Sequence, residues 1–192
     1  AKLKPDAVII VATVRALKYN GGVAKADLNN ENLVALKAGL PNLLKHVENI
    51  TQVFKLPAVV AINEFPLDTP AELALVKEEC QKLGVNVAIS QVWAKGGEGG
   101  KELAQEVIRL IDESKGTFEF SYDLDMSIKD KINAIATKIY GADGVDYTPE
   151  ADKQVANLTK LGFDKVPICM AKTQYSLTDD ATKLGRPTGF RI

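Results

Sequence analysis

Short apolar runs rich in β-branched residues alternate with stretches of helical periodicity, and this alternation constrains the fold more than any other feature of the sequence. Such runs cover 7–14, 57–62, 85–93 and 166–171, and a weaker one covers 118–122. The first two are apolar on both faces, as strands covered by helices on each side should be. Strands separated by helices imply right-handed crossovers and a mostly parallel sheet. We therefore predict an α/β fold of three layers, with a mostly parallel sheet and helices on both of its faces.

The predicted helices have recognisable ends. Leucines recur at spacings of three and four within 31–54, where Pro41 predicts a kink or a restart of the helix. The segment Asp-Thr-Pro-Ala-Glu at 68–72 is typical of a capped entry, and we expect a helix over 70–83 to follow it. Helical periodicity and terminal glycine or proline predict three further helices, at 100–113, 127–140 and 149–161.

The length of 192 residues suits one α/β unit, with a possible sub-boundary near residue 116. On that division, 1–116 would form a βαβαβα core and 117–192 a helical extension with a final strand. The chain opens at Ala1 without an initiator methionine and passes at once into a predicted strand. We interpret the whole of 1–192 as an internal excerpt of a longer protein.

Charge and composition exclude several classes of function. The net charge is −1, from 24 basic and 25 acidic residues, and no polybasic tract is present. Binding of nucleic acid through phosphate neutralisation is therefore not expected. The longest apolar run has eight residues, far short of the roughly 20 needed to cross a bilayer, so we expect no membrane partner. Two cysteines, which we expect to be buried, fit a reducing compartment such as the cytoplasm, and one histidine, His46, excludes a multi-histidine metal site.

Polar, aromatic and glycine residues follow the predicted strands. In parallel sheets, ligands gather beyond the carboxyl ends of the strands. Arg15 and Lys18 follow the first strand, 63–68 the second, 93–100 the third, and Lys172 the last. Functional residues are therefore expected in these four connections.

The glycine-rich segment 95–101 permits a phosphate-binding interpretation, because glycines at a strand-to-helix turn let backbone amides approach an anion. It lacks both the Gly-x-x-x-x-Gly-Lys-Ser/Thr pattern and the Gly-x-Gly-x-x-Gly spacing. A flexible loop that passes close to a ligand fits this segment better, and a plain tight connection remains an alternative.

Two aromatic residues stand out near the predicted strand ends. Trp93 is the sole tryptophan, and its flat ring can stack a heterocycle such as a pterin or purine, although tryptophan is often a core or interface residue. Phe65 and Asn63 lie in a segment similar to the base-recognition loop of nucleotide hydrolases. The alternative gives Asn63 a role in the turn, Phe65 a role in packing and Asp68 a role in helix entry.

Five separated segments, in order, resemble the formate–tetrahydrofolate ligase family, also called formyltetrahydrofolate synthetase. The resemblance runs from about Pro5 to Phe190. The segments that carry it are Ala-Thr-Val-Arg-Ala-Leu-Lys at 12–18, Asn-Glu-Phe-Pro-Leu-Asp-Thr at 63–69, Val-Trp-Ala-Lys-Gly-Gly-Glu-Gly-Gly at 92–100, Lys-Ile-Tyr-Gly-Ala-Asp-Gly at 138–144 and Pro-Ile-Cys-Met-Ala-Lys-Thr-Gln-Tyr-Ser at 167–176.

The resemblance implies an ATP-dependent ligase. Such enzymes convert formate, ATP and tetrahydrofolate into 10-formyltetrahydrofolate, ADP and phosphate through formyl phosphate. Their fold is related to phosphate-loop nucleotide hydrolases, and their glycine-rich phosphate loop lies upstream of the part represented here. Mg is expected with ATP, at a site outside this chain, and the parent enzyme is expected to be a homo-oligomer in the cytoplasm.

The resemblance also implies which residues bind substrate. Phe65 and Trp93 match the aromatic pair that sandwiches the pterin ring. Pro66 and Ile89 match further apolar lining of the folate and nucleotide cleft, with Ile89 standing where leucine is expected, and Asn63 is a candidate contact to a ring edge. The glycines of the same segment would form a mobile wall beside Trp93; they are Gly96, Gly97, Gly99 and Gly100.

No catalytic residue is assigned, and Arg15, Lys18 and Lys172 have no role beyond lying in family-like segments. We expect the excerpt alone to lack activity, because no phosphate loop occurs in 1–192. A stand-alone, non-catalytic module that binds folate or nucleotide is the alternative. A small flavodoxin-like protein is a third reading, against which the ordered motifs argue.

Overall fold

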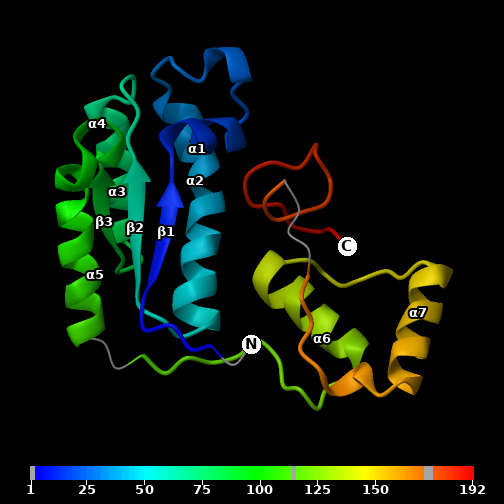
Figure 1. Ribbon diagram of the computed structural model, residues 1–192. Helices are drawn as coiled ribbons and strands as arrows, with labels where there is room; N and C mark the ends of the chain where they lie inside the picture. The colour runs from blue at the N-terminus through cyan, green and yellow to red at the C-terminus, as the bar shows by residue number, and fades with distance from the viewer. Residues whose placement is uncertain (1–2, 114–115, 171–174) are drawn as a thin grey trace. The chain divides into compact units, whose positions relative to one another are not determined.

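A computed structural model describes residues 3–113, 116–170 and 175–192, and the chain divides into two compact units (Figure 1). One unit consists of Lys4–Phe118 together with Leu184–Arg186. The other consists mainly of Glu119–Lys183 and Pro187–Ile192. The first unit holds the sheet, and the two are described separately below.

The sheet of the first unit has three parallel strands in the order β1-β2-β3. β1 spans Val8–Ala12, β2 spans Ala58–Asn63 and β3 spans Asn86–Ser90. Val8 lies opposite Ala58, and Asn63 at the end of β2 lies opposite Ser90 at the end of β3. The predicted parallel α/β architecture is therefore confirmed for its first three strands; β1 and β3 are shorter than their apolar runs, and β2 is shifted by one residue from its run.

Helices form the outer layers of this unit (Figure 1). α2, Leu33–Glu48, and α3, Pro70–Gln81, pack on one face of the sheet, and α5, Lys101–Glu113, packs against β2 and β3 on the other. Every residue of β2 before Asn63 is buried, as expected for a central strand. The main core joins that face of the sheet to α2 and α3; its members include Leu36, Leu40, Leu43, Val47, Val60, Ile62, Val76, Cys80 and Val87.

β1 is covered on one face only. Ile10 and Ala12 pack into the main core, whereas Ile9 and Val11, which point to the opposite face, are 44% and 67% exposed. α5 packs against β2 and β3 and does not cover the β1 edge of the sheet. The prediction of helices on both faces is thus wrong for β1, because an apolar run in sequence does not reveal which of its residues find a cover.

Near the start of the chain, the structure adds one helix and excludes one of the two outcomes predicted at Pro41. Residues that follow β1 form α1, Val14–Asn20, where the sequence suggested a loop. α2 runs without a restart through Pro41 and continues into the π-helical turn η2, Asn49–Val53. An interior proline costs about 3 kcal/mol, and burial of the leucine stripe of α2 in the core offsets that cost.

The second unit is helical. It contains α6, Ile128–Ala134, its π-helical continuation η4, Ile135–Tyr140, and α7, Pro149–Lys160, followed by the short turn η5, Phe163–Lys165. These elements confirm the helices predicted at 127–140 and 149–161. Lys131 of α6 is fully buried and donates hydrogen bonds to the carbonyl oxygens of Asp164 and Val166, 2.5 and 3.2 Å away.

The strand predictions at the two remaining apolar runs are wrong within the described residues, including the one expected to join the parallel sheet. Residues 118–122 and 166–170 form no strand, and Ala171 lies outside the described residues. The phenol of Tyr122 takes the place of a neighbouring strand: it accepts a hydrogen bond from the Ile168 amide (2.8 Å) and donates one to the Ile168 carbonyl (3.2 Å). Without a strand around it Cys169 is exposed, contrary to expectation, whereas Cys80 is buried as expected.

We predict that Gly39→Ala destabilises the first unit, although alanine ordinarily favours a helix over glycine by about 1 kcal/mol. A Cβ at Gly39 would lie 1.8 Å from the carbonyl oxygen of Leu17, where α1 and α2 pack most closely. Overpacking against backbone costs about 1–3 kcal/mol or more. Denaturant unfolding should show a loss of this size. Gly97→Ala is the control, because nothing lies within 4 Å of its added Cβ; equal stabilities of the two variants would contradict the prediction.

Candidate functional site

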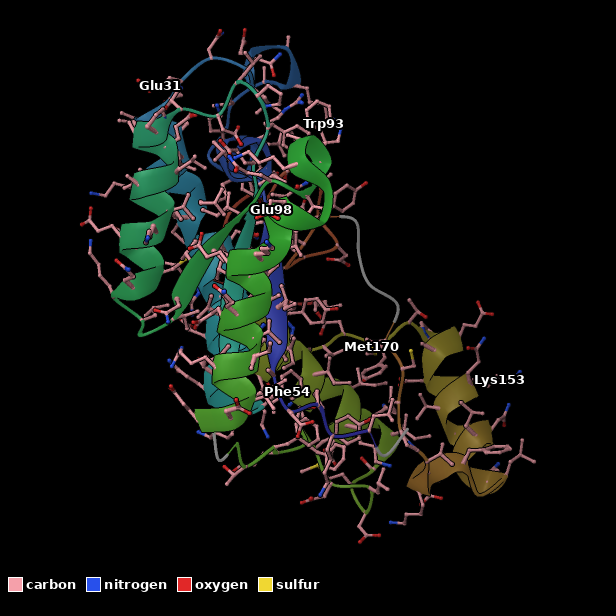
Figure 2. The ribbon with its side chains drawn as sticks, turned by 60° about the vertical axis from the view of Figure 1, so that its left-hand side comes forward. Glu31, Phe54, Trp93, Glu98, Lys153 and Met170 are labelled. Atoms are coloured by element: carbon pink, nitrogen blue, oxygen red, sulfur yellow. The ribbon has the colours of Figure 1, made fainter. Side chains whose placement is uncertain are left out.

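Phe65 and Trp93 lie beyond the carboxyl ends of neighbouring parallel strands. Phe65 is in the turn after β2, and Trp93 is in α4, Val92–Lys95, a single helical turn that follows β3. Both rings are accessible, with 36% of Phe65 and 76% of Trp93 exposed, and Figure 2 shows Trp93 projecting from this end of the unit. Among the described residues no ring contact joins the two. The strand ends thus present two separate flat surfaces.

Hydrogen bonds connect the segments that carry these rings. The Glu64 amide donates to the Ser90 carbonyl (3.1 Å), which extends the β2–β3 ladder by one step. The Gln91 side chain donates to the Glu64 carboxylate (2.6 Å) and accepts from the Lys95 ammonium (2.6 Å). The turn after β2 and the α4 turn are therefore held together by a Glu–Gln–Lys chain.

Asp68 closes the turn that contains Phe65. Its carboxylate accepts a hydrogen bond from the Phe65 amide (2.9 Å), and its own amide donates to the Phe65 carbonyl (2.9 Å). Burial raises the pKa of Asp68, although the hydrogen bond from Phe65 opposes that rise. This acid therefore shapes the turn in addition to its expected place at the entry to α3.

The glycine segment forms the 3₁₀ turn η3, Gly96–Gly100. Gly96 has φ +56°, and the Gly99 carbonyl accepts a hydrogen bond from the Gln91 amide (3.0 Å). A Cβ at Gly99 would lie 2.4 Å from the Gln91 backbone, so the close approach requires glycine there. Lys101 forms an ion pair with Glu98 (2.7 Å) and is not held free for a phosphate.

A recess of about 230 Å³ opens beside Phe65 on the side of α1. The Arg15 guanidinium lies over the Phe65 ring, 5.7 Å from its centroid. Within the described part of the chain Arg15 has no hydrogen bond and no ion pair. The residues that line the recess are Arg15, Leu28, Asn29, Phe65, Pro66, Leu67 and Asp68.

A larger cleft of about 350 Å³ runs along the free edge of β3, between α3 and α5. It reaches Asn86, the first residue of β3, and so lies toward the amino end of the strand. Three of its polar groups pair with one another: Glu106 accepts from Asn86 (2.8 Å) and from Arg109 (2.7 Å). The other charged residues that line it, Lys77 and Glu102, are exposed, unlike the half-buried Arg15.

A buried ion pair supports both walls of the recess. The Lys18 ammonium of α1 lies 2.8 Å from the Glu72 carboxylate of α3, and both side chains are fully buried. Lys18 also donates to the Asn30 carbonyl (2.8 Å), and Glu72 accepts from the amides of Asn32 and Thr69, each at 3.1 Å. The pair thus fixes the 28–32 segment and the start of α3 relative to α1.

The structure brings only some of the predicted site residues close to one another. Asn63 ends β2 half-buried, and its carboxamide has no hydrogen-bonding partner among the described residues. Ile89 is half-buried and packs against the main core. Lys172 lies outside the described residues. Sequence reasoning missed Leu28 and Asn29, which no local pattern marks.

Within the described ranges, no three His, Cys, Asp or Glu side chains gather closely enough to hold a metal ion. None of the helices in the described part of the chain is long and apolar enough to span a membrane.

The family is decided by comparison with known protein families. The family model described as formate–tetrahydrofolate ligase matches residues 1–192, the full length of the chain. The chain belongs to the formate–tetrahydrofolate ligase family. This family comprises ligases of one-carbon metabolism whose substrates are formate, ATP and tetrahydrofolate.

We predict that Glu72→Gln costs about 3–5 kcal/mol of unfolding free energy, because it leaves the buried Lys18 charge uncompensated. Burial alone would raise the pKa of Glu72, but hydrogen bonds from Lys18, Thr69 and Asn32 outweigh it and hold the pKa below its usual 4.5. The stabilisation is therefore present above pH 4.5 and is lost as pH falls through the lowered value. Denaturant unfolding between pH 7 and 3 measures both effects.

Glu79→Gln is the control for this prediction, because Glu79 pairs with Lys82, which is 55% exposed. Surface pairs contribute about 0–1 kcal/mol. If Glu72→Gln costs no more than Glu79→Gln, or if its stability falls with acid as steeply as that of the wild type, the role of the buried pair is refuted.

Proposed function

We propose that this chain supplies the tetrahydrofolate-binding side of the ligase, with the pterin ring stacked between Phe65 and Trp93. The observation that carries the proposal is the exposure of two aromatic rings beyond the carboxyl ends of adjacent parallel strands. Exposed aromatic faces bind flat heterocycles by stacking. The hydrogen-bonded chain through Gln91 supports it further, because it keeps the two segments at a fixed separation.

Other residues of the two segments complete the proposed cleft. The unpaired carboxamide of Asn63 is suited to a polar contact with the ring edge. Pro66 and Ile89 are proposed as apolar lining. The glycine turn forms a wall beside Trp93 in this proposal; its members are Gly96, Gly97, Gly99 and Gly100.

The proposed reaction has two steps. Formate attacks the γ-phosphate of ATP, giving formyl phosphate and ADP; the tetrahydrofolate amine then attacks the formyl carbon, and phosphate leaves. The residues of this chain would hold the acceptor amine in line with the formyl group, and orientation of this kind supplies a large part of a rate enhancement. Neutralisation of the phosphate charge is proposed to come from a phosphate loop outside these 192 residues, on a fold related to phosphate-loop hydrolases, with the Mg that accompanies ATP.

Tetrahydrofolate should quench the emission of Trp93, the lone tryptophan, in the isolated chain. Affinity should be weak, because a stacked aromatic pair contributes about 0.5–1.5 kcal/mol beyond area burial. Phe65→Ala should weaken the binding measured by quenching, since it removes one of the two stacking surfaces.

Phe163→Ala is the control, because Phe163 is a comparably exposed phenylalanine in the second unit. Absence of quenching at millimolar tetrahydrofolate, with the chain shown to be folded, would overturn the proposed pterin site. Equal affinities for the Phe65 and Phe163 variants would remove Phe65 from it.

The 192-residue chain alone should show no formate-dependent ATP turnover, because its sequence contains no glycine-rich phosphate loop and loss of one charge-stabilising group already costs orders of magnitude in rate. Release of phosphate from ATP, measured with and without formate and tetrahydrofolate, tests this. Formation of 10-formyltetrahydrofolate by the purified chain would contradict it. The lack of a phosphate loop in this sequence is also compatible with the alternative, a binding module without catalysis. Folate binding without turnover would fit that alternative as well.

A further inference from the structure

Three residues follow the three strands in the order in which the strands lie in the sheet. Arg15 follows β1, Phe65 follows β2 and Trp93 follows β3. Neighbouring strands are about 4.8 Å apart. A ligand stacked at Phe65 and Trp93 can therefore extend across this end of the sheet toward Arg15 and α1.

Arg15 is the unpaired cation of this region. The residue is half-buried, its guanidinium lies over Phe65, and no hydrogen bond or ion pair engages it within the described residues. Lys18, one turn along α1, donates hydrogen bonds to the Glu72 carboxylate and the Asn30 carbonyl. A guanidinium stacked on a ring keeps its N–H groups available at its edge, and its planar fork matches a carboxylate.

The rest of the recess is not built for an anion alone. Leu28, Pro66 and Leu67 add apolar surface to that of Phe65. Asp68 and Asn29 supply oxygen atoms that can accept a hydrogen bond from an N–H group. The complementary molecule is flat and apolar, with an N–H donor, and ends in a carboxylate.

We propose that the recess binds the p-aminobenzoylglutamate half of tetrahydrofolate, with a glutamate carboxylate on Arg15. The benzoyl ring lies on the apolar wall, the amide N–H faces Asp68 or Asn29, and the carboxylate meets the guanidinium. This assignment rests on the proposed function, because it takes the pterin to be at Phe65 and Trp93. Formate carries the same carboxylate chemistry but has no ring for the apolar wall and no N–H for Asp68, whose negative charge opposes it.

The experiment compares two ligands on the full 192-residue chain by Trp93 emission. Tetrahydrofolate carries the p-aminobenzoylglutamate half, and 6-methyltetrahydropterin lacks it. Arg15→Ala should weaken tetrahydrofolate binding about tenfold or more, as loss of a charge-assisted bidentate contact does, and should leave 6-methyltetrahydropterin binding within twofold. Arg15→Lys should recover part of the loss. Lys37→Ala, at an exposed lysine of α2, removes the same charge outside the recess and should change neither ligand.

The possible outcomes distinguish failure of the tail assignment from failure of the proposed function. If Arg15→Ala binds both ligands as the wild type does, or weakens both equally, the tail assignment is overturned while the pterin site stands. If millimolar formate displaces tetrahydrofolate from the wild type but not from Arg15→Ala, Arg15 binds formate and the assignment is wrong. If neither ligand quenches the Trp93 emission of the folded wild type, both the proposed function and this inference are wrong. Unfolding curves of the Arg15 variants test whether each is folded.

Discussion

The buried pair between Lys18 and Glu72 is the interaction on which the arrangement around the candidate site depends. One carboxylate receives an ammonium from α1, the amide of Asn32 and the amide of Thr69 at the start of α3. Two fully buried charges cost several kcal/mol to desolvate, and in this protein the hydrogen bonds that offset this cost also join three segments of the chain. It brings α1, the 28–32 segment and the turn after β2 together, and these segments form the walls of the recess beside Phe65.

Much of the first unit could be predicted from periodicity, because its elements carry local signals that agree with their packing. The capping box at Thr69 and Glu72 is present as predicted, and Gly84 has the positive φ expected of a helix end. The runs at 118–122 and 166–170 failed because strand formation needs a partner, and apolar character alone does not supply one. Tyr122 satisfies the backbone of Ile168 instead. At Pro41 only the predicted alternative of a restart is excluded, because packing of the leucine stripe keeps α2 continuous.

Some residues of the candidate site could be predicted from the sequence and others could not. Position after a strand was sufficient to select Phe65 and Trp93, because the carboxyl ends of parallel strands meet at one edge of the sheet. It could not reveal α1 or α4, which are short helices with little periodicity, nor the contribution of Leu28 and Asn29. Those residues reach the recess because Lys18 and Glu72 hold their segment there, an interaction between residues 54 positions apart. A contact of this range leaves no pattern within any one segment.

The polar groups at this end of the sheet differ in whether they have a partner within the described part of the protein. Lys18, Gln91, Lys95 and Lys101 all lie in family-like segments or next to them, and each has a partner within the protein. Arg15 and Asn63 lie in the same segments without a partner among the described residues. Arg15 and Asn63 are half-buried residues whose polar groups make no hydrogen bond within the described part of the chain. A ligand of matching charge and polarity can supply the hydrogen bonds that these groups lack, and for this reason the proposed function places substrate beside them.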